Sequence, residues 1–110
     1  MQTTRYLPNV NPGDFYSIQT GKKRFQAVRV IAVESQGLHL TMYRHQFSHR
    51  PTSFNLMVAE SDTEQSTYVP FRWFSFYAMN PEFLAQVPVN PGELVEYQVW
   101  LAEGCVYWGD

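Results

Sequence analysis

Hydrophobic and polar residues alternate with the two-residue period of β-strands along much of the first half of the chain. Residues 15–20 are aromatic and β-branched, and a Pro-Gly-Asp turn signal at residues 12–14 precedes them. Residues 24–34 form the strongest strand pattern, and the Gly-Lys-Lys sequence at 21–23 suits a tight reversal before it. Apolar residues at the centre of 24–34 fall on both faces, so we expect this strand to be covered on both sides or to bend between sheet layers.

The alternation continues, with interruptions, toward residue 79. Residues 38–43 have the pattern of a half-buried strand after a Ser-Gln-Gly turn. Residues 48–53 predict a loop, because Pro51 cannot donate to a strand ladder. Residues 54–60 predict a fourth strand, and a polar loop follows it. Residues 68–79 are aromatic throughout and predict at least one strand, whose side chains can lie either in the core or on the surface.

The last thirty residues contain two signals for helices. Asn80 followed by Pro81 predicts a capped single helical turn over residues 80–84. Asn90, Pro91 and Glu93 have the spacing of a capping box, which predicts a helix over 93–103 with a stripe of Leu94, Tyr97 and Leu101, ended by Gly104. Residues 95–101 also alternate as a strand would, so strand remains the alternative there. Residues 106–108 predict a short final strand.

These elements predict a mainly β fold of the α+β class. Several short strands with one helix are typical of a small SH3-like barrel or of a bent antiparallel sheet with one short C-terminal helix. A length of 110 residues allows one hydrophobic core, so residues 1–110 are expected to form a single domain, with residues 1–12 as an N-terminal arm.

Composition favours contact with other proteins. Aromatic residues make up 16% of the chain and charged residues also make up 16%, so large rings are common and charge is sparse. The net charge of −2 argues against double-stranded nucleic acid, and the basic residues 22–24 suit a solvated turn. No apolar run approaches membrane-spanning length and the N-terminus does not resemble a signal peptide, so we expect a cytoplasmic protein with no membrane contact.

Catalytic and metal-binding patterns are absent from the sequence. The single cysteine, Cys105, excludes an internal disulfide or a cysteine metal site. His39 and His45 lie too far apart on one strand to share an ion, and no nucleophile or phosphate-binding motif occurs. We therefore expect no enzyme activity, no cofactor and no metal. A small enzyme or ligand-binding barrel that uses His45 and a carboxylate is the least favoured alternative.

Residues 43–51 are the most informative stretch for function. They mix aromatic rings with arginine and histidine at the end of a strand, and these residue types are enriched where proteins bind one another. The alternative is that the two rings pack in the core while the arginines pair with nearby acids. Residues 71–74 and the C-terminal tryptophan have a similar character. The predicted partner-binding residues are Tyr43, Arg44, His45, Phe47, Arg50, Arg72, Trp73 and Trp108.

One segment also carries a family resemblance. Its residues are Pro12-Gly13-Asp14-Phe15, Ile18, Gly21, Phe25 and Val28-Arg29-Val30. With them, residues 12–34 resemble the opening hairpin of small bacterial immunity proteins that have an SH3-like β core. The resemblance implies tight binding that occludes the active site of a cognate bacterial toxin.

The sequence thus predicts a non-catalytic protein-binding domain, as a monomer or a homodimer, whose partner is a cognate toxin if the family resemblance holds. The second hypothesis is a small β barrel that binds RNA or single-stranded nucleic acid. In that case Tyr43, Phe47 and Trp73 would stack bases while arginines contact phosphates. The net acidity makes nucleic acid the less favoured partner.

Overall fold

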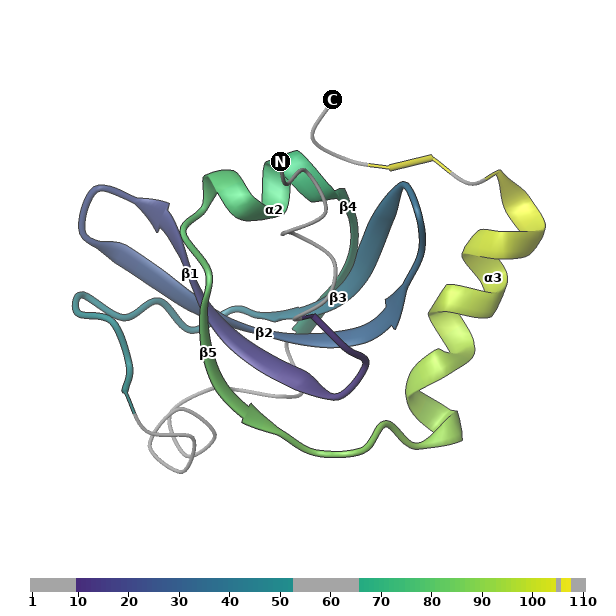
Figure 1. Ribbon diagram of the computed structural model, residues 1–110, viewed down its shortest axis with the longest axis horizontal. Helices are drawn as coiled ribbons and strands as arrows, with labels where there is room; N and C mark the ends of the chain where they lie inside the picture. Colours follow the sequence, from purple (N-terminus) through teal and green to yellow (C-terminus); the bar gives the residue numbers. More distant parts are fainter. Residues whose placement is uncertain (1–9, 53–65, 105, 108–110) are drawn as a thin grey trace, which may run out of the picture.

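The computed structural model describes residues 10–52, 66–104 and 106–107 (Figure 1). The predicted strand 54–60, most of the N-terminal arm and Trp108 lie outside the described residues. The remainder contains five strands, two α-helices and one 3-10 helix.

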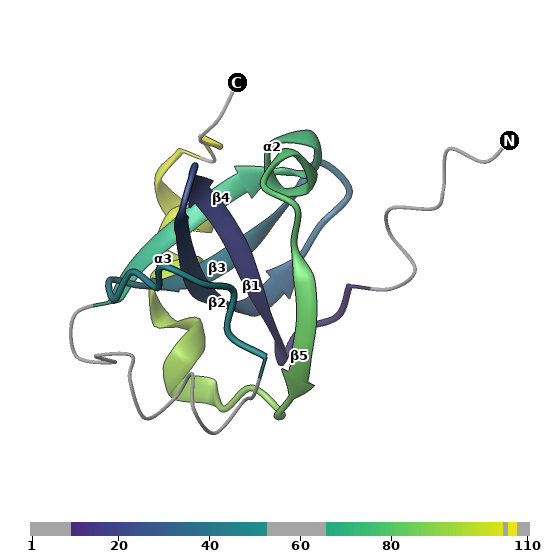
Figure 2. The same cartoon turned by 90° about the vertical axis from the view of Figure 1, so that its left-hand side faces the viewer.

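One five-stranded antiparallel sheet forms the centre of the protein. Its strands are β1 (Asp14–Gly21), β2 (Arg24–Val33), β3 (Gly37–Tyr43), β4 (Ser66–Arg72) and β5 (Glu82–Gln86). Their order across the sheet is β4-β3-β2-β1-β5, and the sheet is not closed into a barrel (Figures 1 and 2). Register shifts in the β1–β2, β1–β5 and β2–β3 pairs are irregularities of the kind that bend strands. The mainly β prediction is therefore confirmed, in its bent-sheet form.

The main hydrophobic core lies on the face of the sheet that carries helix α2 (Trp73–Ala78). Side chains from β1, β2 and β3 on this face pack against two rings of α2, Trp73 and Phe76. The aromatic run 68–79 thus divides into an edge strand and a short helix. The prediction of at least one strand there is confirmed by β4, and the helix was not predicted. Phe76 is completely buried, while Phe74 on the same helix is 63% exposed, so the run contributes to both core and surface.

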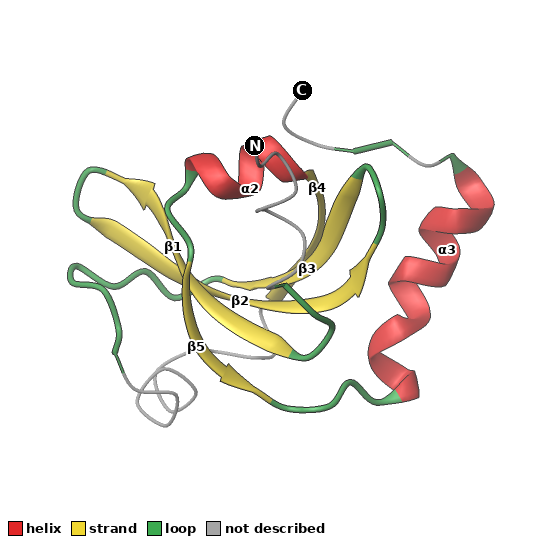
Figure 3. Ribbon diagram, viewed as in Figure 1, coloured by secondary structure: helices red, strands yellow, loops and turns green. Residues whose placement is uncertain are grey.

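The opposite face of the sheet is covered at its two ends by different segments. The 3-10 helix η3 (Pro91–Leu94) and helix α3 (Val95–Glu103) lie at one end, and the loop after β3 lies at the other (Figure 3). A second cluster, formed by Phe15, Ala27, Tyr43 and Phe47, packs beneath that loop. Both faces of β2 are therefore buried at its centre, as its sequence predicted.

The predicted helix near the C-terminus is confirmed, and the alternative of a strand is wrong. The Asn90 side chain accepts a hydrogen bond from the Glu93 backbone N–H, and the Glu93 carboxylate accepts one from the Asn90 N–H, which is the expected capping box. Gly104 ends the helix as expected. The predicted stripe is only partly correct, because Leu101 is exposed and the side chains that meet the sheet are Tyr97 and Trp100.

Two smaller predictions are wrong. Residues 80–84 were expected to form a helical turn, but Glu82–Gln86 form strand β5, which pairs with β1. Asn80 adopts φ 52°, a left-handed conformation that commonly follows the end of a helix, so it terminates α2 and does not begin a new helix. Residues 106 and 107 form no strand; instead the Tyr107 ring is buried and its hydroxyl donates a hydrogen bond to Glu34.

A buried ion pair joins η3 to the sheet. The Arg29 side chain from β2 is 5% exposed, and its Nε lies 2.7 Å from Glu93 Oε2. Its Nη2 donates to Glu93 Oε1 at 3.2 Å and to the Pro88 carbonyl at 3.0 Å, and the guanidinium lies over the Phe15 ring. The hydrogen bonds hold Glu93 in place while Glu93 also caps the helix start, and they lower the pKa of Glu93 although burial alone would raise it.

Candidate functional site

The candidate segment 43–51 alternates between anchoring and exposed residues. Tyr43 and Phe47 are each only 8% exposed, and both belong to the second hydrophobic cluster. Arg44, His45 and His49 are exposed. The two rings therefore fix the segment to the sheet, which is the core alternative left open for them, while the polar residues between them face solvent.

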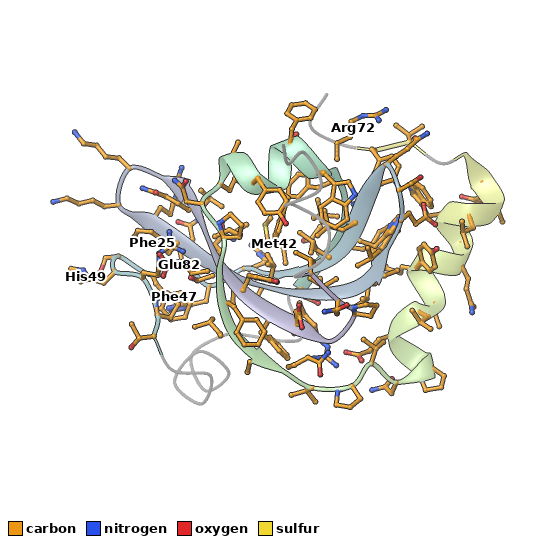
Figure 4. All side chains as sticks on the ribbon, viewed as in Figure 1. Phe25, Met42, Phe47, His49, Arg72 and Glu82 are labelled. Atoms are coloured by element: carbon orange, nitrogen blue, oxygen red, sulfur yellow. The ribbon has the colours of Figure 1, made fainter. Side chains whose placement is uncertain are left out.

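Backbone hydrogen bonds hold this segment against the beginning of β2. Phe25 and Phe47 exchange two of them, with N···O distances of 2.9 and 2.8 Å. In addition, the Gln26 side chain donates a hydrogen bond to the Tyr43 carbonyl at 3.0 Å. Figure 4 shows Phe25 and Phe47 close together at one end of the molecule, with His49 farther out on the same side. The loop is thus tied to the β1–β2 hairpin by backbone as well as by packing.

Arg50 makes its contacts within the protein. Its Nη1 donates to the Ser17 carbonyl at 2.9 Å and to the Ser17 hydroxyl at 2.8 Å. Its Nε lies 3.5 Å from a Glu82 carboxylate oxygen, and its guanidinium lies over the Phe25 ring. These contacts tie the far side of the loop to β1 and β5. We therefore assign Arg50 a positioning role at this end of the molecule.

The loop lies beside the tip of the β1–β2 hairpin, which carries three further basic residues. Residues 22–24 are all exposed. We call the surface formed by residues 22–24 and 44–50 the basic end. Of the seven lysines and arginines among the described residues, five lie in it: Lys22, Lys23, Arg24, Arg44 and Arg50. Sequence reasoning treated residues 22–24 as a solvated turn and missed this proximity, which arises from the way the loop folds back.

The other predicted site residues lie elsewhere. Figure 4 shows Arg72 well separated from Phe47, at the end of β4. Its guanidinium lies over the Tyr107 ring, 5.4 Å from the ring centroid. Trp73 is 8% exposed and donates its indole N–H to the Glu34 carbonyl at 2.9 Å. The structure thus brings together five of the predicted residues and separates Arg72 and Trp73 from them, while Trp108 lies outside the described range.

A second cluster of polar side chains was missed by sequence reasoning. His39 of β3 is completely buried, with Nδ1 2.6 Å from the Tyr68 hydroxyl and Nε2 3.7 Å from a Glu34 carboxylate oxygen. The Glu34 carboxylate accepts hydrogen bonds from the Tyr97 and Tyr107 hydroxyls. The rings of Tyr97 and Trp100 from α3 also pack on His39. Sequence alternation placed His39 on the polar face of a half-buried strand, and only the position of α3 shows that this face is covered.

Electrostatics in this cluster favour a neutral imidazole beside a carboxylate. Burial lowers the pKa of His39, and the nearby Glu34 carboxylate opposes this effect without cancelling it. Burial alone would raise the pKa of Glu34, but hydrogen bonds from Tyr97 and Tyr107 outweigh it and lower that pKa. The cluster therefore joins α3 and residue 107 to the sheet through a fixed arrangement of hydrogen bonds.

His39 should make the free energy of unfolding depend on pH in a range where the glutamates Glu34 and Glu93 do not contribute. Its pKa is lowered in the folded protein, so the unfolded chain takes up a proton first as the pH falls through the ordinary value of 6.5. The free energy of unfolding should therefore decrease below about pH 6.5, by up to about 1.4 kcal/mol per pH unit. Urea titrations at several pH values between about 7 and 5 measure this slope.

Matched variants separate His39 from other groups. Glu34 and Glu93 also have lowered pKa values, but they act below their ordinary value of 4.5, outside this window. His39→Gln should flatten the slope, whatever its effect on the stability at pH 7, while His49→Gln, on the exposed loop, should leave it unchanged. An equal slope in the His39→Gln variant would contradict the assignment.

The three histidines do not form a common site. His39 lies beneath α3, whereas His45 and His49 are exposed on the loop at the basic end. Among the described residues, no group of three or more His, Cys, Asp or Glu side chains is arranged to hold a metal ion. The Glu34–His39 pair has the groups needed for proton transfer, but the imidazole is enclosed by rings and faces no solvent.

Comparisons with protein-family models, with curated proteins and with solved structures found no match. Within the part of the chain that the structure describes, none of the helices has the length and apolar character needed to cross a membrane.

Proposed function

We propose that this chain is a non-catalytic protein-binding domain that docks an acidic surface of its partner through the basic end. The observation that carries this proposal is the gathering of five of the seven described lysines and arginines on two neighbouring segments. The one described carboxylate in contact with them, Glu82, is paired with Arg50. The positive charge of the remaining four side chains therefore faces outward without a described acidic partner nearby.

The anchoring of the loop supports binding. A loop that must become ordered when it binds loses affinity, because ordering costs conformational entropy. Here Tyr43 and Phe47 are buried, the Phe25–Phe47 backbone pair is formed, and Arg50 closes the far side. Arg44, His45 and His49 are consequently presented on a segment that is already in place, and their side chains are the ones we expect to touch the partner.

Charge separation supports the choice of an acidic partner. Residues 91–104 carry three glutamates and no lysine or arginine, and they lie at the opposite end of the same sheet face. Such a distribution orients a molecule as it approaches a charged partner and speeds association at low salt. Association at the basic end should therefore weaken as salt is added.

Within this class, we favour an immunity protein that neutralises a cognate bacterial toxin in the cytoplasm by covering its active site. Residues 12–34, which resemble the opening hairpin of such proteins, include the hairpin tip of the basic end. The mainly β fold is consistent with the family's β core, although the sheet is open. The partner would then be a protein encoded next to this one.

Nucleic acid is the second candidate, because phosphates also seek a basic surface. The rings proposed to stack bases are not available for it: Tyr43, Phe47 and Trp73 are each 8% exposed. Stacking on aromatic side chains contributes a large share of single-strand binding. The structure thus retains only the electrostatic part of that hypothesis, which makes a protein the favoured partner.

The test neutralises the basic end without touching its structural contacts. The triple variant Lys22→Gln/Lys23→Gln/Arg44→Gln leaves Arg24 and Arg50, which hydrogen-bond within the protein, in place. The partner is first identified by co-purification from the native host, and its affinity for both proteins is then measured by calorimetry. We expect the triple variant to bind on the order of tenfold to a hundredfold more weakly, with a smaller salt dependence.

A control with the same net charge shows whether position matters. Gln36→Glu/Gln98→Glu/Ala102→Glu adds three negative charges at exposed positions away from the basic end. This control should bind as the wild type does. The proposal would be refuted if the triple variant bound the partner as tightly as the wild type does, or if no near-stoichiometric protein partner were recovered. If the wild type were retained on an oligonucleotide column and the triple variant were not, nucleic acid would be the favoured partner.

A further inference from the structure

A pocket lies between the edge strand β4 and helix α3, away from the basic end. Its volume is about 370 Å³, and it is lined by Tyr68 from β4 and by Glu96, Val99 and Trp100 from α3. The three helical residues stand three and four positions apart, so they share one face of α3. The pocket is a shallow hollow that is open to solvent, so it suits a small ligand bound at the surface.

The two rings that line the pocket are held in fixed positions. The Tyr68 hydroxyl is 2.6 Å from His39 Nδ1, and its ring stacks on the imidazole. The Trp100 indole N–H donates to the Val106 carbonyl at 2.9 Å, and its ring meets His39 edge-on at 4.4 Å between centroids. The polar ends of both rings are therefore already engaged within the protein, and ring surface lines the pocket.

The charge around the pocket is negative. Glu96 belongs to its lining, and Glu34 lies beneath it through the His39 cluster. Burial raises the pKa of Tyr68, and the nearby Tyr97, Glu34 and Glu96 raise it further. Residues 91–104 contain no lysine or arginine that would offset these carboxylates.

We propose that this pocket binds an organic cation, a substituted ammonium or a guanidinium group, between the Tyr68 and Trp100 rings and beside the Glu96 carboxylate. Aromatic faces attract cations through their ring quadrupoles, and tryptophan does so most strongly. The lining offers few groups that could replace the water around a primary ammonium. Weakly hydrated cations, whose charge is spread over methyl groups or a planar guanidinium, therefore fit it best.

The test compares a small cation with an uncharged molecule of the same shape. Choline and its neutral isostere 3,3-dimethylbutan-1-ol are titrated into the protein and followed by NMR on the backbone amides of residues 94–104 and 66–72. We expect choline to shift these resonances and to bind on the order of fivefold or more tightly than the isostere, because only choline carries the charge that the rings and Glu96 recognise. Butylguanidinium and the primary amine butylammonium are titrated in the same way, and butylguanidinium should bind more tightly than butylammonium.

Two variants of helix α3 show whether the Glu96 carboxylate contributes to cation binding. Glu96→Gln should weaken choline binding by on the order of fivefold. Glu103→Gln removes an exposed glutamate of the same helix that does not line the pocket, and it should have a clearly smaller effect. Both positions are exposed, so the fold should survive either change. Equal binding of choline and its isostere, equal binding by Glu96→Gln, or no shift at all would overturn the proposal. Because no macromolecular partner enters the experiment, its outcome does not depend on the proposed function of the basic end.

Discussion

Replacing Arg29 with methionine is expected to lower the free energy of unfolding by about 3–5 kcal/mol. The change keeps the length and apolar stem of the side chain but removes a guanidinium that is 5% exposed. Glu93 is then left half-buried without its cation, and the Pro88 carbonyl loses its donor. An unpaired charge in such a position costs more than the pair contributed, because the carboxylate is partly removed from water and has lost the guanidinium that compensated for this. Urea unfolding followed by circular dichroism measures the loss.

Two further variants isolate the ion pair. Arg24→Met removes an exposed arginine at the start of the same strand, whose one described hydrogen bond goes to the Thr20 carbonyl, and it should cost less than about 0.5 kcal/mol. Combining Arg29→Met with Glu93→Gln should restore part of the stability, because the unpaired Glu93 carboxylate is then replaced by a neutral amide. A loss below about 1 kcal/mol for Arg29→Met would show that this pair does not hold η3 to the sheet.

Phe76→Ala is the second change with a large expected effect. Phe76 is completely buried in the main core and meets the Tyr16 ring edge-on, 5.4 Å between centroids. Its removal leaves a cavity beneath α2 and should lower the free energy of unfolding by about 3–5 kcal/mol.

Phe74 supplies a control for Phe76 on the same short helix, since it is 63% exposed. Phe74→Ala should cost less than about 1 kcal/mol. Both changes remove the same side chain from positions two residues apart in α2, so helix propensity does not account for the difference. Comparable losses for the two variants in urea titrations would mean that α2 does not pack on the sheet by its Phe76 face.

Local sequence patterns predicted the central strands and favoured the C-terminal helix over a strand. Residues 24–34 carry apolar side chains on both faces, which predicted a strand covered on both sides or bent between layers, and β2 is buried on both faces at its centre. The helix start was recognisable because a capping box needs only the side chain of Asn90 and that of Glu93, three residues later. Patterns of this kind depend only on residues that are close in sequence, so they can be recognised without knowledge of the tertiary structure.

The wrong or incomplete predictions of secondary structure occurred where the same residue pattern is compatible with two different structures. Asn followed by Pro can begin a helix, but Asn also tolerates the left-handed conformation that ends one, and Asn80 does the latter. The aromatic run suited a strand by propensity alone, yet Trp73 and Phe76 stand three residues apart and share one face of α2. Tertiary packing on β1 and β3 selects the helix there, and the local sequence does not contain that information.

The candidate site was only partly predictable for a similar reason. Segment 43–51 could be recognised by its composition, but which of its side chains are anchors depends on the pairing of Phe47 with Phe25. Arg50 and the exposed Arg44 look alike in sequence and differ only in what lies opposite them. The His39 cluster joins residues from both halves of the chain, so no local sequence pattern could predict it.

An open sheet keeps two border strands, β4 and β5, which have no further strand beside them among the described residues. Pro70 stands within β4 and has no N–H, so the row of donors along that border is broken. Strand β5 has five residues, begins directly after Pro81, and ends two residues before Pro88. A strand from another molecule would find too few consecutive backbone partners on either border to extend the sheet, which limits its growth into ribbons of stacked copies.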